Sequence, residues 1–355
     1  MVQRLPPVIF CLLLCSFFLS CSPTTLSPVQ PSLYLYRFNP PAFVELSIDL
    51  QPVNEIPFSI PLNCSLFDVF PAPIGKFLSV ELSCPNGQTV LFLDTETGSI
   101  TQPVQETDSH FLAWANDGES AYLKVDSFGS TRVVRAYTIG KEMDLNINGW
   151  TYDLSAKTNS DDFIFSYSRG IGYGSELYSA QDSGRNSKLL YKDQFNYISF
   201  ARTSPDDSRI AFIKIPDSQT PFTVGALWVI DVDGANAREL TEVDAGHGYA
   251  ANWSPDGRWI AFVKRENADD ENADRSSDSL ISNIYLLNVQ SGELKPVTSF
   301  TSGYAETPHW SPDGNTLVFN TVLNGRMEVQ IADIATGESH ALIAEPACCP
   351  AWMRK

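Results

Sequence analysis

The chain is short of positive charge. Lysine and arginine together number 24 against 42 aspartate and glutamate residues, so the formal net charge of the 355 residues is −18. Nucleic acids and anionic lipid headgroups attract proteins through basic surfaces, which this composition does not provide. We therefore expect no nucleic-acid partner, and a cationic or neutral partner is favoured.

Long hydrophobic runs are also missing, except at the N-terminus. There Arg4 precedes an apolar stretch, residues 8–19, which is too short to span a bilayer as a mature helix and which Cys21 soon follows. This order of features predicts an export signal over residues 1–20. Residues 18–21, Phe-Leu-Ser-Cys, resemble a lipoprotein cleavage box in which Phe stands where Leu is usual.

An export signal of this kind predicts that the rest of the chain lies outside the cytoplasm. We expect lipidation at Cys21 and a tether over residues 21–31, which are rich in Ser, Thr and Pro. Ordinary cleavage and release is the alternative. The expected product is an extracytoplasmic, membrane-anchored lipoprotein on the periplasmic or cell-surface side, with a net charge of −19 once residues 1–20 are removed.

A short motif recurs through the C-terminal half of the chain. Ser-Pro-Asp followed by Gly or Asp precedes an apolar run such as Ile-Ala-Phe, and in two of three copies a Trp comes first. The copies begin at Thr203, Trp253 and Trp310. Because Pro presets φ and Gly permits positive φ, the motif predicts a tight turn between two strands. All-strand repeats of roughly 40 to 50 residues are typical of a propeller.

Each copy continues with a third strand that ends in a Gly turn, as at residues 231–234, and a short fourth strand, as at 238–241. Four antiparallel strands form one blade, whose two apolar faces remain in water unless blades stack around an axis. Weaker copies lie upstream. We use the Trp position of each copy as its anchor, and the anchors are Pro71, Trp114, Ala156, Thr203, Trp253, Trp310 and Trp352.

The last anchor, Trp352, lacks a blade of its own because only three residues follow it. Three strand-like runs precede the first anchor, at residues 33–38, 43–50 and 56–60. We expect the C-terminal strand to join these three in a composite blade that closes the ring. The prediction is an all-β, single-domain β-propeller over residues 32–355, with seven four-stranded blades favoured and six or eight possible.

The combination of Trp-Ser-Pro-Asp-Gly, Ile-Ala-Phe, an acidic Gly turn and Leu-Thr resembles the TolB-type, WD-repeat-like propellers of bacteria. The resemblance is strong over residues 197–352, weaker over 64–196 and absent before residue 32. It implies a propeller that acts outside the cytoplasm in recognition rather than catalysis. Such propellers also form the N-terminal half of prolyl peptidases, but the sequence ends at Lys355 and holds no Gly-x-Ser-x-Gly elbow, so we do not expect a peptidase.

Cysteine is scarce in the expected mature chain. Besides Cys21, only Cys64, Cys84, Cys348 and Cys349 remain. The turn of the first blade centres near residue 74, so position 71 should face 77 and, in the same register, position 64 should face 84. We predict a Cys64–Cys84 disulfide. For the adjacent pair Cys348 and Cys349, a vicinal bridge and two free thiols are both open.

The two faces of the predicted ring differ. Turns between first and second strands, and between third and fourth strands, share one face and are short. Connections between second and third strands share the other face with the blade-to-blade links, and they are longer at residues 124–131, 168–175, 214–225 and 264–282. Irregular loops on a rigid scaffold usually hold binding groups, so we predict the binding surface on this second face, around the mouth of the central channel.

Aromatic and acidic side chains in these links and loops are the candidate binding residues for a peptide or a sugar. Tyr249 and Tyr304 share a Gly-Tyr-Ala context, so a repeated packing role is an equal alternative for them. The predicted rim consists of Tyr173, Tyr197, His247, Tyr249, Tyr304 and Glu306.

A metal site is the less favoured interpretation of the histidines. His110, His247 and His309 precede anchors in what we take to be blade-to-blade links, and some propeller lyases that act on pectin oligosaccharides hold a metal with comparably placed histidines. The three lie in different blades, and scattered surface histidines are the commoner case. The acidic run at residues 266–274 lacks the Gly and the spacing of a calcium loop, so we expect a solvated insertion and no cofactor.

These observations predict a monomeric, non-catalytic binding or scaffold module for a protein or glycan at the cell envelope. The alternative is a metal-dependent polysaccharide lyase or hydrolase whose site lies at the channel mouth.

Overall fold

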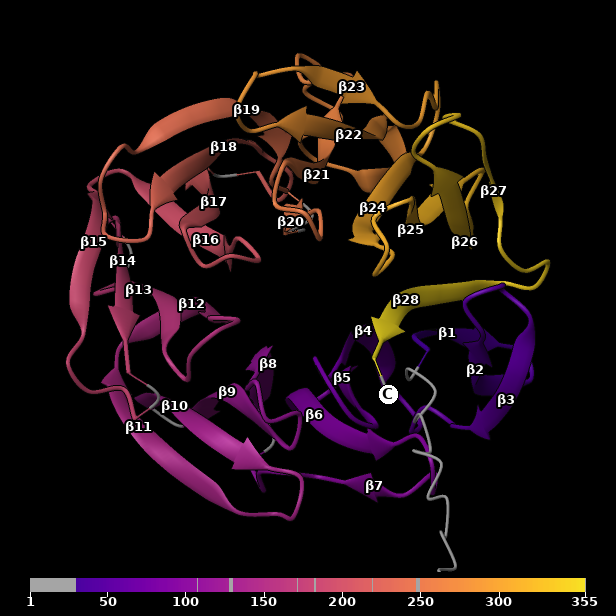
Figure 1. Cartoon of the computed structure of the whole chain (residues 1–355), viewed down its shortest axis with the longest axis horizontal. Helices are drawn as coiled ribbons and strands as arrows, with labels where there is room; N and C mark the ends of the chain where they lie inside the picture. The colour runs from indigo at the N-terminus through magenta and orange to yellow at the C-terminus, as the bar shows by residue number, and fades with distance from the viewer. Residues whose placement is uncertain are drawn as a thin grey trace, which may run out of the picture.

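The computed structural model describes residues 30–106, 108–127, 130–170, 172–181, 183–218, 220–246 and 250–354. All named strands within these residues belong to seven four-stranded antiparallel sheets, which stand around one axis as the blades of a β-propeller (Figure 1). The favoured prediction of seven blades is confirmed. Among these residues, no helix has the length and apolar character needed to span a membrane.

Blades 1 to 3 contain the weaker copies of the repeat, and in each the first strand lies nearest the axis (Figure 1). Blade 1 consists of β4 (Ser65–Pro71), β5 (Phe77–Cys84), β6 (Gly87–Asp94) and β7 (Ile100–Thr101). Blade 2 consists of β8 (Ser109–Trp114), β9 (Ser120–Ser127), β10 (Ser130–Tyr137) and β11 (Glu142–Asn148). Blade 3 consists of β12 (Trp150–Ala156), β13 (Phe163–Ser168), β14 (Ser175–Ala180) and β15 (Lys188–Asp193).

Blades 4 to 6 contain the three clear copies of the motif. Blade 4 consists of β16 (Asn196–Thr203), β17 (Arg209–Pro216), β18 (Val224–Asp231) and β19 (Arg238–Asp244). Blade 5 consists of β20 (Asn252–Trp253), β21 (Trp259–Arg265), β22 (Ser282–Asn288) and β23 (Leu294–Pro296), with the short 3-10 helix η1 (Ser277–Ser279) before β22. Blade 6 consists of β24 (Tyr304–Trp310), β25 (Thr316–Leu323), β26 (Arg326–Asp333) and β27 (Ser339–Ala341).

Blade 7 joins the two ends of the described chain. Its strands are β28 (Ala347–Met353) nearest the axis, followed by β1 (Ser32–Phe38), β2 (Pro41–Leu46) and β3 (Pro52–Pro57). Leu33 pairs with Trp352 and Arg37 with Ala347 in the antiparallel ladder between β1 and β28. The predicted composite blade is therefore confirmed.

The apolar triplet of the repeat explains why blades stack. Side chains alternate between the two sides of a strand, so Ile210 and Phe212 pack against blade 3 while Ala211 between them packs against blade 5. Each of the seven clusters of buried apolar residues lies between two neighbouring blades. A large buried side chain contributes about 1.5–3 kcal/mol, and here that stabilisation requires the neighbouring blade.

The Ser-Pro-Asp-Gly motif is a turn held by its own side chains. The Ser254 hydroxyl donates to Asp256 Oδ1 at 2.6 Å and accepts the amide of Trp259 at 3.0 Å, and Asp256 Oδ1 also accepts the amide of Arg258. Ser311 and Asp313 repeat these bonds in blade 6. The motif therefore fixes the turn between the first and second strands of its blade.

The first blade differs from its predicted register. Pro71 lies opposite Leu78, so the prediction that position 71 faces 77 is wrong. A β-bulge between Leu66 and Asp68 then shifts the ladder, and Ser65 lies opposite Ser83. Because a bulge adds one residue to one strand, it cancels the first error. Cys64 and Cys84 form a disulfide, with their Cα atoms 4.2 Å apart.

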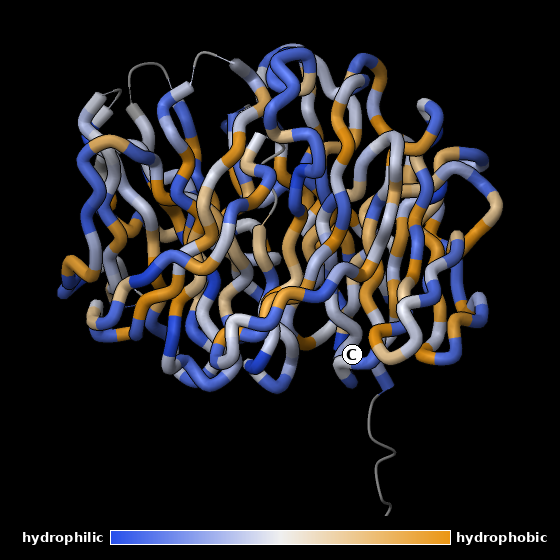
Figure 2. The backbone as a smooth tube through the Cα atoms, turned by 90° about the horizontal axis from the view of Figure 1, so that it is seen from above, coloured by the Kyte–Doolittle hydropathy of each residue, from blue (hydrophilic) through white to orange (hydrophobic). Residues whose placement is uncertain are grey.

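We call the two faces of the ring the turn face and the loop face. The turn face has the turns between first and second strands, and the last strand, β28, ends there, at the lower edge of the ring in Figure 2. The loop face has the connections between second and third strands. β9 and β10 pair out to Ser127 and Ser130, so only two residues connect these strands and the expected long connection at residues 124–131 is wrong.

The acidic stretch over residues 264–282 is a loop of blade 5 that contacts blade 4. Arg265 is fully buried at its start, where it contacts Asp244 at 3.0 Å and Asp274 at 2.9 Å. Asn267 closes the loop further, because its amide donates to the carbonyl of Ser279 and accepts the amide of Ile281.

Candidate functional site

The innermost strands are irregular at one shared level. Phe200, Thr307 and Cys349 each lie three residues before an anchor, and each has positive φ, at 57°, 45° and 62°. Positive φ is uncommon for residues other than Gly and is a strained conformation for a β-branched Thr. The ladders that contain Phe200 and Thr307 shift register there. The regular pairing of these inner strands is therefore interrupted at one level between the two faces.

A funnel of about 610 Å³ opens at the turn-face end of the axis. Side chains from every blade except blade 2 line it, with prolines of the turns at the rim and the anchor tryptophans in the wall. The lining residues are Pro71, Ala72, Pro73, Thr158, Arg202, Thr203, Pro205, Asn252, Trp253, Pro255, His309, Trp310, Ser311, Pro312, Trp352 and Arg354.

The tryptophan wall is fixed by bonds between blades. The indole N–H of Trp253 donates to the carbonyl of Arg202 at 2.9 Å, and that of Trp310 donates to the carbonyl of Asn252 at 3.0 Å. Trp114 makes the same bond to Phe70 in blade 1. The indole N–H of Trp352 is buried without a partner. Trp114, Trp253 and Trp310 therefore each link their blade to the preceding blade, and Trp352 of blade 7 makes no such bond.

Polar side chains one residue before the anchors lie deeper in the funnel. Arg202 Nη1 contacts both carboxylate oxygens of Asp153, at 3.0 and 2.9 Å, and also donates to the carbonyl of Ala201. Burial raises the pKa of Asp153 even though Arg202 opposes this effect. His309 lines the same space, and desolvation together with the charge of Arg202 lowers its pKa to about 4. The imidazole is therefore neutral at neutral pH.

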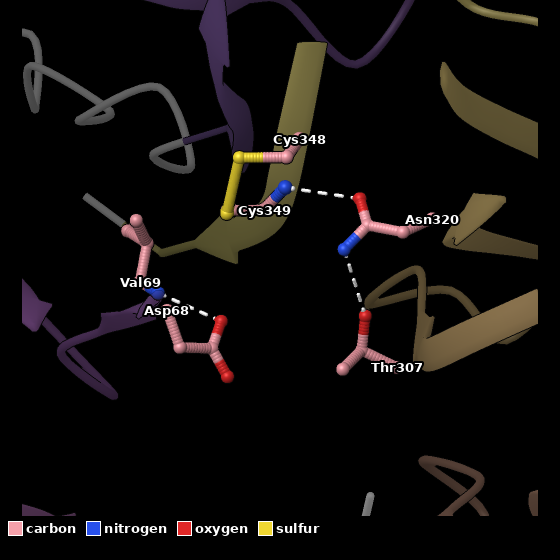
Figure 3. The surroundings of a disulfide bond; sticks show 6 residues. All are labelled: Asp68, Val69, Thr307, Asn320, Cys348 and Cys349. Carbon is pink, nitrogen blue, oxygen red and sulfur yellow. Dashed lines mark hydrogen bonds between the residues drawn. A yellow bond between two sulfur atoms is a disulfide. The ribbon is translucent and has the colours of Figure 1, made fainter. Parts of the chain in front are cut away.

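The opposite end of the axis holds an adjacent-residue disulfide between Cys348 and Cys349, next to blades 6 and 1 (Figure 3). The amide of Cys349 donates to Asn320 Oδ1 at 3.0 Å, and Asn320 Nδ2 donates to the Thr307 hydroxyl at 3.2 Å. On the other side, the carboxylate of Asp68 accepts the amide of Val69 at 2.7 Å. The vicinal bridge, one of the two open alternatives, is the state in the structure.

Carboxylates gather around this disulfide. Desolvation raises the pKa of Asp68 to about 7, and the negative charges of Glu81 and Glu306 raise it further against the amide of Val69. Glu81 is buried beside Asp68 in the ladder of blade 1, and Glu306 comes from blade 6. The ring therefore brings together acidic groups that are far apart in the sequence.

His110 belongs to the same acidic end. Its Nδ1 lies 3.4 Å from Glu81 Oε1, and its Nε2 lies 3.3 Å from Asp108 Oδ1 and 3.7 Å from Asp126 Oδ2. Ligand atoms of Asp108, His110 and Asp126 all lie within 4.8 Å of one another, a donor set that suits a divalent transition metal. Lys124 contacts Asp126 at 3.0 Å and competes with a cation for it.

The predicted metal ligands do not converge within the described residues. His110 and His309 lie in strands β8 and β24, so placing them in blade-to-blade links was wrong. His110 is at the loop-face end and His309 is in the funnel at the turn face. His247 lies outside the described residues, as do Tyr249 and Cys21.

The remaining rim residues are spread over three blades. Tyr173 is 68% exposed in the loop of blade 3. Tyr197 belongs to β16, not to a link, and its ring meets that of Tyr152 edge-on at 5.4 Å. Tyr304 opens β24 and is half-buried, and Glu306 is buried near Asp68. Only Glu306 therefore joins a cluster at the axis.

Sequence analysis did not identify the funnel. The sequence feature that could have revealed the funnel is a polar residue directly before an anchor, as in Arg202, Asn252 and His309. These positions look like ordinary strand residues until the ring places them together.

The comparisons agree with this architecture. Residues 201–353 match the TolB β-propeller domain family. The chain is 30% identical over 121 residues to the uncharacterized peptidase YuxL of Bacillus subtilis. The matched segment is 34% of this chain and only 16% of the length of YuxL.

Two solved structures share the fold. The TolB of Acinetobacter baumannii is 14% identical, with a TM-score of 0.53 over 93% of this chain and 68% of that one. An oligogalacturonate lyase in complex with manganese is 12% identical, with a TM-score of 0.57 over 85% of this chain and 90% of that one. The chain therefore has a β-propeller fold, and its residues 201–353 match the TolB β-propeller domain family.

Proposed function

We propose that this protein is an exported, lipid-anchored, non-catalytic binding module that holds a segment of a protein partner in the funnel at the turn face. The observation that carries the proposal is the funnel itself, a space of about 610 Å³ with Trp and Pro walls and a few polar groups at depth. Recognition sites usually combine an apolar concave lining with a small number of placed polar groups. The surrounding turns are fixed by their own hydrogen bonds, so the site is preformed.

In this proposal the lipid anchor lies on the same side of the ring as the funnel. Ser32 pairs with Met353, and β28 ends at the turn face, so the first described strand begins at this face. A tether over residues 21–31 would reach at most about 35–40 Å when fully extended. A lipid at Cys21 therefore keeps the funnel close to the membrane, and the partner is another protein of the same envelope.

Site-specific photo-cross-linking in intact cells tests the proposal. Benzoylphenylalanine in place of Thr158, an exposed residue of the funnel, should capture a defined protein. The same group in place of Ile139, which is 74% exposed on an outer turn, is the matched control and should not. Equal capture at both positions, or capture at neither, would exclude the funnel as the binding site.

The lipid anchor has a separate test. Replacing Cys21 with Ser should move the protein from the membrane to the soluble fraction of the envelope. A variant that stays in the membrane fraction would contradict the anchor.

A metal-dependent polysaccharide lyase or hydrolase is the second candidate, and the group of Asp108, His110 and Asp126 favours it. Metal analysis of the purified protein beside His110→Asn decides between the two. A stoichiometric metal that the variant loses would support the enzyme, and polysaccharide cleavage would then be assayed with both proteins. No metal in the intact protein would end this candidate.

A further inference from the structure

The charge of the funnel is opposite to that of the whole chain. Acidic residues outnumber basic ones by 42 to 24, yet the described lining contains Arg202 and Arg354 and not one carboxylate. Asp153 pairs with Arg202 but is buried and does not line the funnel, and the carboxylates of Glu81 and Glu306 lie around Asp68. A cavity in an acidic protein whose charged lining residues are arginines favours an anionic group on the ligand.

Arg202 has hydrogen-bonding capacity that the described protein leaves unused. A guanidinium has five N–H donors in a fixed fork. The hydrogen bonds of Arg202 to described residues all use Nη1, which Asp153 and the carbonyl of Ala201 hold in place, while Nε and Nη2 have no partner among these residues. The side chain is 28% exposed and lines the funnel. Its free donors are thus held in place and open to the funnel.

His309 adds a second open group. It lines the funnel, and neither ring nitrogen hydrogen-bonds to a described residue. The two side chains are close enough for the charge of Arg202 to affect His309. A neutral imidazole donates one N–H, which complements the fork of Arg202 without adding charge.

We propose that Arg202 and His309 form a subsite for a carboxylate, so that the funnel selects peptide segments with a C-terminal carboxylate or an acidic side chain. This proposal rests on the proposed function, because it names the chemistry of the partner in the same funnel. Arg–carboxylate pairs are charge-assisted and often bidentate, which gives both affinity and orientation. Trp253 and Trp310 supply the apolar contacts on either side.

Four peptides test the subsite: acetyl-Leu-Ala-Leu as free acid and as amide, and the amides of acetyl-Leu-Glu-Leu and acetyl-Leu-Gln-Leu. Titrations follow the indole N–H signals of the full-length protein by NMR. We expect a carboxylate peptide to bind about tenfold tighter than its matched neutral peptide. The pair that shows the preference identifies the source of the carboxylate, a chain end or a side chain. Equal binding within both pairs, or no binding of any peptide, would overturn the proposal.

Two variants test whether the preference for carboxylate peptides depends on Arg202. Arg202→Gln alone leaves Asp153 without its partner, so the double variant Arg202→Gln with Asp153→Asn keeps the fold testable. We expect it to bind all four peptides alike. Arg354→Gln, which removes the other funnel arginine, is the matched control and should keep the preference. A double variant that folds, by near-UV circular dichroism, and still prefers carboxylates would refute the assignment.

The cross-linking experiment at Thr158 separates the two proposals. Capture of a partner without any carboxylate preference leaves the proposed function standing and refutes the subsite. Absence of capture at Thr158 refutes the proposed function itself.

Discussion

The two ends of the axis are built from the same strands and have opposite chemistry. At the turn face, Arg202 and His309 lie in a funnel whose described lining has no carboxylate. At the loop face, Asp68, Glu81 and Glu306 crowd around a disulfide. Arg202 and His309 lie one residue before an anchor and Asp68 lies three before, while Glu81 comes from β5, the second strand of its blade. The level within the inner strand therefore separates Asp68 from Arg202 and His309.

The largest expected effect on stability is the difference between removing one disulfide and removing the other. Cys64–Cys84 closes a segment with a separation of 20 residues, while Cys348–Cys349 joins neighbours. A cross-link stabilises mainly by restricting the unfolded chain, and more so for longer loops. Cys64→Ser with Cys84→Ser should lower the free energy of unfolding by about 3 kcal/mol. Cys348→Ser with Cys349→Ser should cost less than about 1 kcal/mol by the same principle.

Urea denaturation of both double variants measures this difference. If both double variants lose the same free energy of unfolding, the Cys348–Cys349 bridge stabilises the loop-face end by more than its restriction of the unfolded chain.

Removal of a carboxylate from the loop-face end should stabilise the protein. The pKa of Asp68 is raised to about 7 from 3.8, so the folded state holds a proton that the unfolded chain releases, and the free energy of unfolding falls as pH rises through this window. Asp68→Asn removes the dependence and should be about 1–2 kcal/mol more stable above pH 7, a figure reduced for solvent access. Val69 can still donate to the amide oxygen.

Thermal unfolding of both proteins from pH 4 to 8 tests this sign. A variant that is less stable at pH 8 would mean that the Asp68 carboxylate has a stabilising partner.

At the funnel end the pH dependence should have the opposite sign. The pKa of His309 is lowered to about 4 from 6.5, so the unfolded chain takes up a proton that the folded state does not, and stability falls as pH drops from 6.5 to 4. His309→Gln should remove about 1–2 kcal/mol of this loss. The free energies of unfolding of the protein and of His309→Gln, each measured at pH 7 and pH 5, test this prediction. If the gap between the two proteins is the same at both pH values, His309 is not held neutral in the folded state.

The smallest effect concerns the tryptophan wall. Trp310→Phe and Trp352→Phe remove the same atoms, but only Trp310 donates an indole N–H to the preceding blade. The first variant should therefore be about 1 kcal/mol less stable than the second. Equal urea midpoints would show that the bond between blades contributes nothing.

The sequence predicted the features that repeat. Ser254 and Asp256 hold a turn with their own side chains, so a local pattern was enough to count blades and to place the C-terminal strand in one blade with the N-terminal strands. The register of blade 1 could not be predicted, because the bulge before Asp68 leaves no mark in composition.

The candidate site was out of reach for a different reason. Asp153 and Arg202 are 49 residues apart, and His309 is in yet another blade. Only the ring, with backbone irregularities such as those at Phe200 and Thr307, brings them together. Arg202 also precedes Thr203, in the one clear copy that lacks Trp, so nothing in the repeat singled it out.

The shared blade has a consequence for biogenesis. β28 pairs with β1, which lies more than 300 residues earlier in the sequence, so the ring cannot close until β28 has been synthesised. Until then β1 offers an unpaired backbone edge to any passing strand. Truncations that remove β28 should therefore leave an open, aggregation-prone ring rather than a smaller propeller.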